Sequence, residues 1–285
     1  MSLLKTVFAV CRQNFRKWKT DYRIWVIAAT MIIIVQIYVD DMRKISEYLN
    51  TNIPIWIFPF LYSQFHTKLI YTLPIILLFC NAPFCDNDQI FVYTRVGRKK
   101  WLCGQMLYIV IAAAMYYFFL LIVSLVSTVF IGEISMEWGK TLQTLAVSNI
   151  GFRVGSPFVD VSGLIVDFFT PLQAIGFTFL VSWLCAIFLG LLIFFCNTVF
   201  KTKFIGTMIS SALVVLSVLV ENGGYSFIIR YSPVSWSTLD NIDVGGLTIN
   251  PSFGYCMGVY LTLIAVLIAG IFIFCRKQNL DMKGS

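Results

Sequence analysis

The chain alternates long apolar runs with short polar segments, and this pattern predicts helices that cross a membrane. A helix needs about 20 mainly apolar residues to span the hydrocarbon core of a bilayer. Six runs approach or exceed this length: 24–39, 69–85, 103–131, 172–197, 205–220 and 254–275. The first and fifth are short, so flanking polar side chains must reach toward the headgroups. The third is long enough to tilt or to project beyond the lipid.

The composition supports the same class of protein. Of the 285 residues, 59% are hydrophobic and only 12% are charged, and the mean hydropathy is +0.83. A soluble domain carries roughly 25% charged residues, so this much apolar surface has to lie in lipid. We expect an all-α polytopic membrane protein with six transmembrane helices. Its expected parts are a cytoplasmic segment 1–23, a transmembrane domain 24–275 and a cytoplasmic tail 276–285.

Positive charge is distributed unevenly between the loops. With both termini in the cytoplasm, most of the 21 Lys and Arg residues are cytoplasmic, whereas most of the 14 acidic residues lie outside. The cytoplasmic set comprises Lys5, Arg12, Arg16, Lys17, Lys19, Arg23, Arg95, Arg98, Lys99, Lys100, Lys201, Lys203, Arg276, Lys277 and Lys283. Because short cytoplasmic loops carry the excess of Lys and Arg, we predict N-in and C-in topology, in a multi-pass protein of the plasma membrane.

Residues 4–23 have a basic amphipathic pattern on a helical wheel. The apolar positions on one face are Leu4, Val7, Phe8, Cys11, Phe15 and Trp18. The basic positions beside them are Lys5, Arg12, Arg16, Lys19 and Arg23. Such an elbow helix would lie flat on the cytoplasmic leaflet, held by roughly 1 kcal/mol per basic residue near an anionic surface. A plain orientation signal is the alternative, but the regular stripe favours the helix.

The expected outer loops, 40–68, 132–171 and 221–253, are rich in aromatic residues and proline. Segments such as PIWIFPFLY suit interfacial or re-entrant chain, although ordinary loops with interfacial anchors fit equally well. Glu221 and Arg230 flank a glycine-containing turn after the fifth run. They are candidates for an outer gate pair, with solvated headgroup contacts as the alternative.

Residues that carry enzymatic chemistry are sparse. His66 is the single histidine of the sequence, the eight cysteines form no C-x-x-C pair, and the apolar runs contain almost no charge. The segment GEISMEWGKT ends like a phosphate-binding loop, but six residues rather than four separate Gly132 from Gly139. We therefore expect no enzyme, no metal site and no nucleic-acid partner, and no ATP hydrolysis by this chain itself. Intramembrane charge is what ion-coupled carriers use, so an external source of energy is favoured.

The densest polar segment, CDNDQIFVYTRVGRKKWLCGQ, lies between the second and third runs. Asp86 or Asp88 can cap a short helix, and Gly97 would end it before the third run begins. The positions available to a partner protein are Gln89, Ile90, Phe91 and Tyr93, with Arg95 and Arg98 able to pair with acidic side chains. A solvated orientation signal is the alternative, but it would require only scattered Lys and Arg.

The elbow, the six runs with both ends inside, the capped segment before R-x-G-R-K-K-W and the aromatic outer regions together resemble the permease subunit of type-2 ABC transporters. The resemblance implies that residues 86–102 form a coupling loop resting on separate ATPase subunits, which bind ATP and Mg²⁺. It also implies a homodimer of permeases. The longer outer loops are similar to those of Gram-positive permeases that export, or give immunity to, antimicrobial peptides and drugs.

The uncharged, aromatic spans favour an apolar or amphipathic cargo, peptide or drug-like, that leaves the cell. Two other functions remain open. A non-transporting membrane scaffold or sensor would bind a cytoplasmic partner without ATP-dependent flux. A secondary carrier would move its substrate on an ion gradient and ignore nucleotide.

Overall fold

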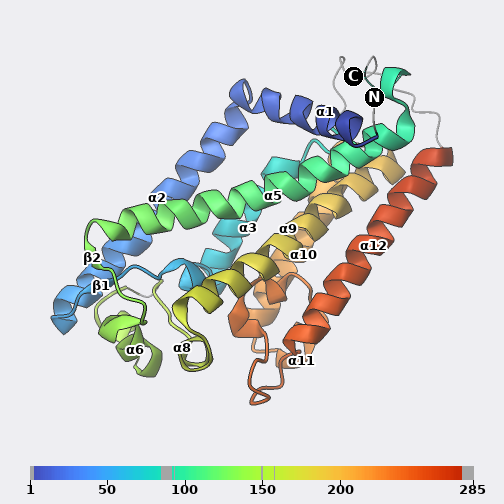
Figure 1. Ribbon diagram of the computed structural model, residues 1–285. Helices are drawn as coiled ribbons and strands as arrows, with labels where there is room; N and C mark the ends of the chain where they lie inside the picture. The colour runs from blue at the N-terminus through green and yellow to red at the C-terminus, as the bar shows by residue number, and fades with distance from the viewer. Residues whose placement is uncertain (1–2, 85–91, 93, 149, 157, 278–285) are drawn as a thin grey trace.

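The structure is a computed structural model that describes residues 3–84, 92, 94–148, 150–156 and 158–277. Its long helices pack into one bundle, as Figure 1 shows. Within the described residues, five helices are long and apolar enough to cross a membrane: α2 (Tyr22–Leu49), α5 (Arg98–Val129), α9 (Pro171–Phe200), α10 (Ile205–Asn222) and α12 (Phe253–Lys277). A predominantly helical protein of the membrane class is therefore supported.

Helix α3 (Phe65–Phe79) is the short member of the bundle. The sequence predicted a run over 69–85, but the helix begins earlier and a turn replaces its expected last part. Pro83 lies in that turn; it has no N–H, and it disfavours helical backbone in the preceding residue. At about 1.5 Å per residue, α3 is roughly 22 Å long, shorter than the roughly 30 Å hydrocarbon core. Length alone therefore does not make α3 a sixth span.

Helix α2 is longer than the predicted run 24–39, so residues 40–49 are not loop. Met42 and Ile45 are buried one turn apart and continue the packed face of the helix. Lys44 Nζ lies 2.7 Å from Asp41 Oδ1, a pair at the i, i+3 spacing that suits a helix. The helix ends at Asn50, whose φ of 49° is left-handed, a common conformation for a residue that stops a helix. The sequence did not predict this extension, because residues 40–49 mix charged and apolar positions.

The N-terminal segment is a helix, but the prediction of one continuous helix over 4–23 is wrong. Helix α1 (Leu3–Arg16) is followed by a 3-10 turn, Lys17–Lys19, and α2 then begins in a new direction (Figure 1). The Asp21 carboxylate accepts a hydrogen bond from Arg23 N at 3.0 Å and caps α2. Because the axis changes there, Arg23 does not continue the basic stripe of α1.

One side of α1 packs on α5 instead of facing outward. Val7, Val10 and Cys11 are buried, and α5 has a glycine, Gly104, where α1 crosses it. A Cβ at Gly104 would lie 2.6 Å from Val10 Cβ, so a larger residue would push the helices apart. Leu4 and Phe8, on the same apolar face of the wheel, remain exposed. The predicted apolar face is thus divided between packing within the protein and an exposed edge.

Helix α9 is the core of the bundle. In its apolar stretch of 18 residues, 72% of the residues are buried, compared with 17% in the corresponding stretch of α12 and 28% in that of α2. Gly190 allows a close approach, because a Cβ there would lie 2.7 Å from Ile109 Cγ2 of α5. The peripheral helices present large apolar side chains outward, among them Phe118, Leu261, Val266 and Ile273. Exposed surface of this kind is stable when lipid covers it.

A buried asparagine joins three segments at one end of the bundle. Asn197 of α9 donates to Ala82 O at 2.8 Å and accepts from Gly206 N of α10 at 2.8 Å. Its side chain therefore fixes the turn that follows α3 and the start of α10 to the same point on α9.

Short elements gather at the opposite end of the bundle (Figure 1). The strands β1 (Ile53–Pro54) and β2 (Gly132–Glu133) pair in parallel, Ile53 opposite Gly132. Around them lie α6 (Gly139–Val147), α7 (Ile150–Arg153), α8 (Gly163–Phe168) and α11 (Ser226–Ile229). Three 3-10 turns, Phe58–Phe60, Ser235–Ser237 and Leu239–Asn241, complete this end.

The aromatic segment predicted as interfacial or re-entrant chain is buried inside the protein. Ile57, Phe58, Phe60 and Leu61 are each at most 1% exposed. Irregular backbone at membrane depth is tolerated only where protein or water covers it. Coverage by the neighbouring helices satisfies this condition for residues 53–62.

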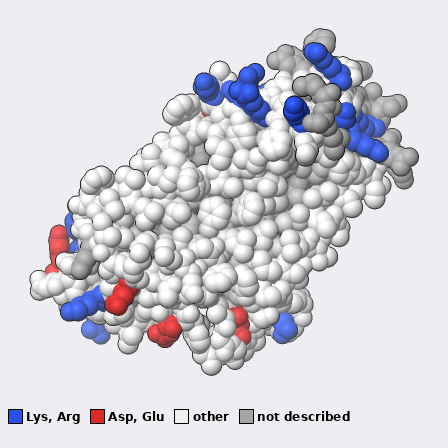
Figure 2. Space-filling view, viewed as in Figure 1, with Lys and Arg blue, Asp and Glu red and all other residues white. Residues whose placement is uncertain are grey.

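Charged side chains are confined to the two ends of the molecule on the face seen in Figure 2. Lys and Arg dominate the end where α1 and the last turn of α12 lie, whereas the other end carries acidic and basic side chains together. A broad uncharged belt separates them. This distribution is typical of a protein that sits across a bilayer.

Candidate functional site

The predicted coupling segment is only partly within the described residues. Asp86, Asp88, Gln89, Ile90, Phe91 and Tyr93 lie outside them. Val92 and residues 94–96 are helical. Gly97 then adopts a φ of 84°, a left-handed value that favours glycine, and α5 begins at Arg98. A helical stretch that breaks at Gly97 agrees with the sequence interpretation.

Arg95 and Arg98 have different surroundings. Arg95 is exposed, whereas Arg98 is half-buried. Trp101, one turn after Arg98, is only 1% exposed. Arg98 therefore lies at the packed start of α5, while Arg95 is accessible to a partner.

The basic residues of the predicted elbow also divide into two groups. Lys5, Arg12, Arg16 and Lys19 are exposed. Arg23 is half-buried at the start of α2, where its Nη1 donates to Cys80 Sγ at 3.1 Å. The four exposed basic residues can face an anionic surface, whereas Arg23 contacts the end of α3.

The predicted gate pair of Glu221 with Arg230 is not formed. The Glu221 carboxylate instead accepts from Lys68 Nζ at 2.8 Å and 3.0 Å. Arg230 is exposed, with its guanidinium carbon 5.9 Å from the centre of the Tyr255 ring. One feature of the sequence could have indicated the true partner: Lys68 directly precedes the apolar run 69–85.

The Lys68–Glu221 pair is almost inaccessible to water. The side chains are 1% and 10% exposed, and Lys68 Nζ also donates to Ser235 O at 2.9 Å. Lys68 lies in the first turn of α3 and Glu221 in the last turn of α10. Lys68 lies at the N-terminal end of α3, which is partially positive, and Glu221 lies at the C-terminal end of α10, which is partially negative. Both placements are unfavourable, so the ion pair is needed to offset the helix dipoles and the cost of burying the two charges. The pair joins α3, α10 and the turn Ser235–Ser237.

A second buried acid lies near this pair. The carboxylate oxygens of Asp240 are shielded from solvent. Burial raises the pKa of Asp240 above its ordinary value and the Asp160 charge adds to the increase, while the Lys68 charge offsets part of it. Sequence reasoning missed Asp240 because a single Asp in a loop gives no signal of burial.

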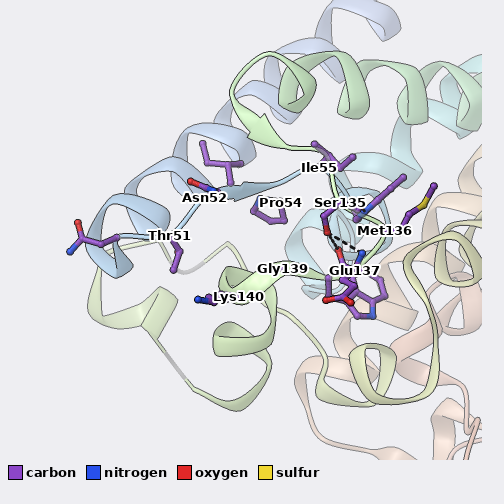
Figure 3. Close-up of a pocket in the computed structure, with 13 residues that line it drawn as sticks. Thr51, Asn52, Pro54, Ile55, Ser135, Met136, Glu137, Gly139 and Lys140 are labelled. Atoms are coloured by element: carbon purple, nitrogen blue, oxygen red, sulfur yellow. Dashed lines mark hydrogen bonds between the residues drawn. The ribbon is translucent and has the colours of Figure 1, made fainter.

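A pocket of about 650 Å³ opens at the same end of the bundle, between residues 50–56 and 135–140 (Figure 3). Its walls combine amide and hydroxyl groups with Pro54, Ile55 and Met136, and its charged side chains are Glu137 and Lys140. Thr141 is the last residue of the segment that resembles a phosphate-binding loop, but its hydroxyl donates to Asn52 O at 2.7 Å. The hydroxyl that would serve a nucleotide-bound metal thus holds α6 to the chain beside β1.

Groups of three or more His, Cys, Asp or Glu side chains arranged to hold a metal ion do not occur within the described part of the chain. What the described residues bring together is a buried cluster of Lys68, Glu221 and Asp240 at one end, and at the other end exposed basic residues such as Arg95 and Lys99.

Replacing Lys68 with methionine should strongly destabilise the protein. Removing one partner of a buried ion pair leaves the other charge uncompensated, which costs about 3 to 5 kcal/mol. Chemical unfolding of the purified protein in detergent measures this change, and the double variant Lys68→Met/Glu221→Gln should recover part of the loss. Arg230→Gln is the matched control and should cost less than about 1 kcal/mol. Equal losses for Lys68→Met and Arg230→Gln would contradict the assignment.

Asp240→Asn should stabilise the protein at neutral pH. Because the pKa of this carboxyl is raised in the folded state, wild-type stability falls as pH rises from the ordinary value of about 3.9 through the native value. The asparagine stays neutral, so its advantage in unfolding temperature should be present at pH 7 and shrink as pH approaches about 4. Asp167→Asn, at an exposed position, is the control. A wild type at least as stable as Asp240→Asn at pH 7 would refute this interpretation.

No protein-family model, no curated protein and no solved structure is significantly similar to this chain. Its function has to be inferred from its own residues.

Proposed function

We propose that this chain is the membrane-spanning permease subunit of an ATP-driven exporter of the type-2 ABC class. The observation that carries the proposal is an apolar helical bundle whose helix α5 follows a short helical stretch, residues 94–96 with the exposed Arg95, that breaks at Gly97. A segment of this form can transmit force from a cytoplasmic partner, because only Gly97 separates it from a helix of 32 residues. ATP and Mg²⁺ would be bound by that partner.

The proposed topology has six spans, with α3 as the second. Two contacts support this role for α3 despite its length. Lys68, in its first turn, pairs with the last turn of α10, and Cys80, after its final residue, contacts Arg23 at the start of α2. Helix α3 thus extends between the two ends of the bundle. The buried residues 57–62 would occupy the part of the membrane thickness that α3 is too short to cross.

The basic end of the bundle is the proposed cytoplasmic face. It carries α1, the residues around Gly97 and the last turn of α12, in agreement with an excess of Lys and Arg on the cytoplasmic side (Figure 2). In this orientation α1 lies along the inner surface of the plasma membrane. The pocket of Figure 3 and the Lys68–Glu221 pair then belong to the outer side.

The exposed apolar faces support a second copy and an apolar or amphipathic cargo. Helices α5 and α12 carry exposed side chains such as Phe118, Leu261 and Val266, which either lipid or another permease can cover. A peptide or drug-like molecule with an apolar face is compatible with this surface. Homodimerisation and the choice of cargo are parts of the proposal.

Secondary transport is the second candidate, because buried ionisable groups can couple flux to an ion gradient. Lys68, Glu221 and Asp240 are such groups. They lie at one end of the bundle rather than at mid-depth, which favours a structural role. Flux that collapses with the ion gradient and ignores nucleotide would select this alternative, and partner binding without flux would select a scaffold or sensor.

The exporter proposal predicts that Arg95→Glu uncouples the chain from its ATPase. The chain would be co-purified with the product of a neighbouring gene that carries a phosphate-binding loop, and cargo-stimulated ATP hydrolysis would be measured in vesicles. Reversal of this exposed charge should reduce recruitment or stimulated hydrolysis by about tenfold, the effect of roughly 1.4 kcal/mol at an interface. Membrane insertion should be unchanged.

Lys19→Glu is the matched control, since Lys19 is also exposed and basic but lies outside the coupling segment. Arg98→Glu is less suitable because Arg98 is half-buried and would disturb the fold. Wild-type recruitment and stimulated hydrolysis in Arg95→Glu, or flux without any ATPase, would overturn the proposal.

A further inference from the structure

A second pocket, of about 350 Å³, lies at the basic end of the bundle where α1 turns into α2. The 3-10 turn, the start of α2, the end of α3 and α5 all contribute to its wall. Its polar lining includes Lys17, Asp21 and Arg23, and its apolar lining includes Ile24, Leu77 and Leu78. The pocket is therefore lined by both charged and apolar side chains.

The break between α1 and α2 places two cations at this pocket. Thr20 N and Asp21 N both donate to Lys17 O at 3.0 Å, so the chain reverses tightly and places Lys17 and Arg23 on one pocket. The Asp21 carboxylate caps α2 and lies 4.0 Å from Arg23 Nε. Among the described residues, the pocket thus combines two cationic side chains with one carboxylate.

Arg23 retains capacity to bind an anionic oxygen. A guanidinium has five N–H donors, and a thiol is a weak acceptor. Besides the adjacent Tyr22 hydroxyl, the contacts of this side chain are Cys80 Sγ at 3.1 Å and the Asp21 carboxylate at 4.0 Å. A phosphate oxygen would be a stronger acceptor than the thiol, and Arg binds phosphate through two parallel hydrogen bonds.

The aromatic wall of the pocket is held in place by its own contacts. Trp18 Nε1 donates to Tyr108 Oη at 2.8 Å. The Tyr108 ring lies 4.8 Å from the Phe84 ring and 4.9 Å from the Phe15 ring, centre to centre. The site is therefore preorganised, which lowers the cost of ordering it around a ligand.

An exposed apolar track leads away from the pocket along α3. Leu77 lines the pocket and is 39% exposed. Leu73 and Ile70, one and two turns earlier on the same face, are 40% and 38% exposed. A ligand whose charged head occupies the pocket can thus extend an alkyl chain along this track.

We propose that this pocket binds the headgroup of one anionic phospholipid of the basic-side leaflet, with Lys17 and Arg23 on its phosphate and an acyl chain along Leu77, Leu73 and Ile70. The apolar track distinguishes a lipid from free phosphate. The site is also distinct from the exposed stripe of Arg12, Arg16 and Lys19, which attracts any anionic surface without selecting one molecule. The inference does not depend on the transport proposal.

The test titrates the purified full-length chain in neutral detergent with phosphatidylglycerol, and bound lipid is counted by native mass spectrometry. Lys17→Gln/Arg23→Gln should weaken binding of the first lipid by about tenfold or more, since two charge-assisted contacts are lost. Arg12→Gln/Lys19→Gln removes the same charge from exposed positions and should change binding by less than about twofold. Phosphatidylcholine should bind the wild type far more weakly, and millimolar inorganic phosphate should not displace phosphatidylglycerol.

Equal weakening by the two double variants, equal binding of the two lipids, or displacement by inorganic phosphate would each overturn the proposal. Because Arg23 also contacts Asp21 and Cys80, Lys17→Gln is tested as a single variant as well, and it too should weaken phosphatidylglycerol binding. A photoreactive phosphatidylglycerol supplies a readout on the unaltered protein. Crosslinks should map to residues 14–24, 70–84 and 108, and crosslinks confined to residues 4–12 would contradict the site.

Discussion

The exclusion of charge from a wide apolar belt is the constraint on which the rest of this structure depends. Surface of this kind is stable only in lipid, and lipid offers no hydrogen bonds to an exposed backbone. Chain that crosses the belt must therefore be helical or be covered by helices. The central α9, the peripheral α2, α5 and α12, and the buried irregular segment at residues 53–62 all satisfy this requirement.

The same constraint explains where the polar interactions lie. Lys68 and Glu221 are buried, so they are tolerated only as a pair with an additional acceptor, Ser235 O. Asn197 similarly satisfies both its amide groups where three segments meet. At the basic end, Arg23 sits between a capped helix and a pocket, where lipid phosphate can complete its contacts. The two ends are thus fixed by specific polar contacts, while the belt combines apolar packing with hydrogen bonds between helices, such as Trp183 Nε1 to Val110 O.

Much of the helical order could be predicted from the sequence, because run length and apolar composition are local properties. The runs 172–197, 205–220 and 254–275 correspond closely to α9, α10 and α12. The run 24–39 underestimated α2, since residues 40–49 mix charged positions with the buried Met42 and Ile45. The wheel over 4–23 assumed one axis and missed the turn at Lys17–Lys19, which decides where Arg23 points.

Side-chain pairing was much less predictable. Glu221 was paired with Arg230 because the two are close in sequence, yet its partner Lys68 is 153 positions away. Hydropathy indicates that a residue is buried or near a membrane surface, but it does not show which distant segment covers it. Asp240 and the pocket beside Trp18 depend on such non-local packing, so no motif revealed them. The coupling segment was proposed from its local pattern, and within the described residues the break predicted at Gly97 is observed.

The central claim is that the charged ends of the bundle lie on opposite sides of a membrane, with the segment around Gly97 in the cytoplasm. Lysine modification in intact cells by a membrane-impermeant amine reagent, read by mass spectrometry, tests it without any substitution. The exposed Lys44 and Lys140 should be modified, whereas the exposed Lys5, Lys19 and Lys99 should react only after permeabilisation. Modification of Lys99 in intact cells, with Lys140 protected, would contradict the account.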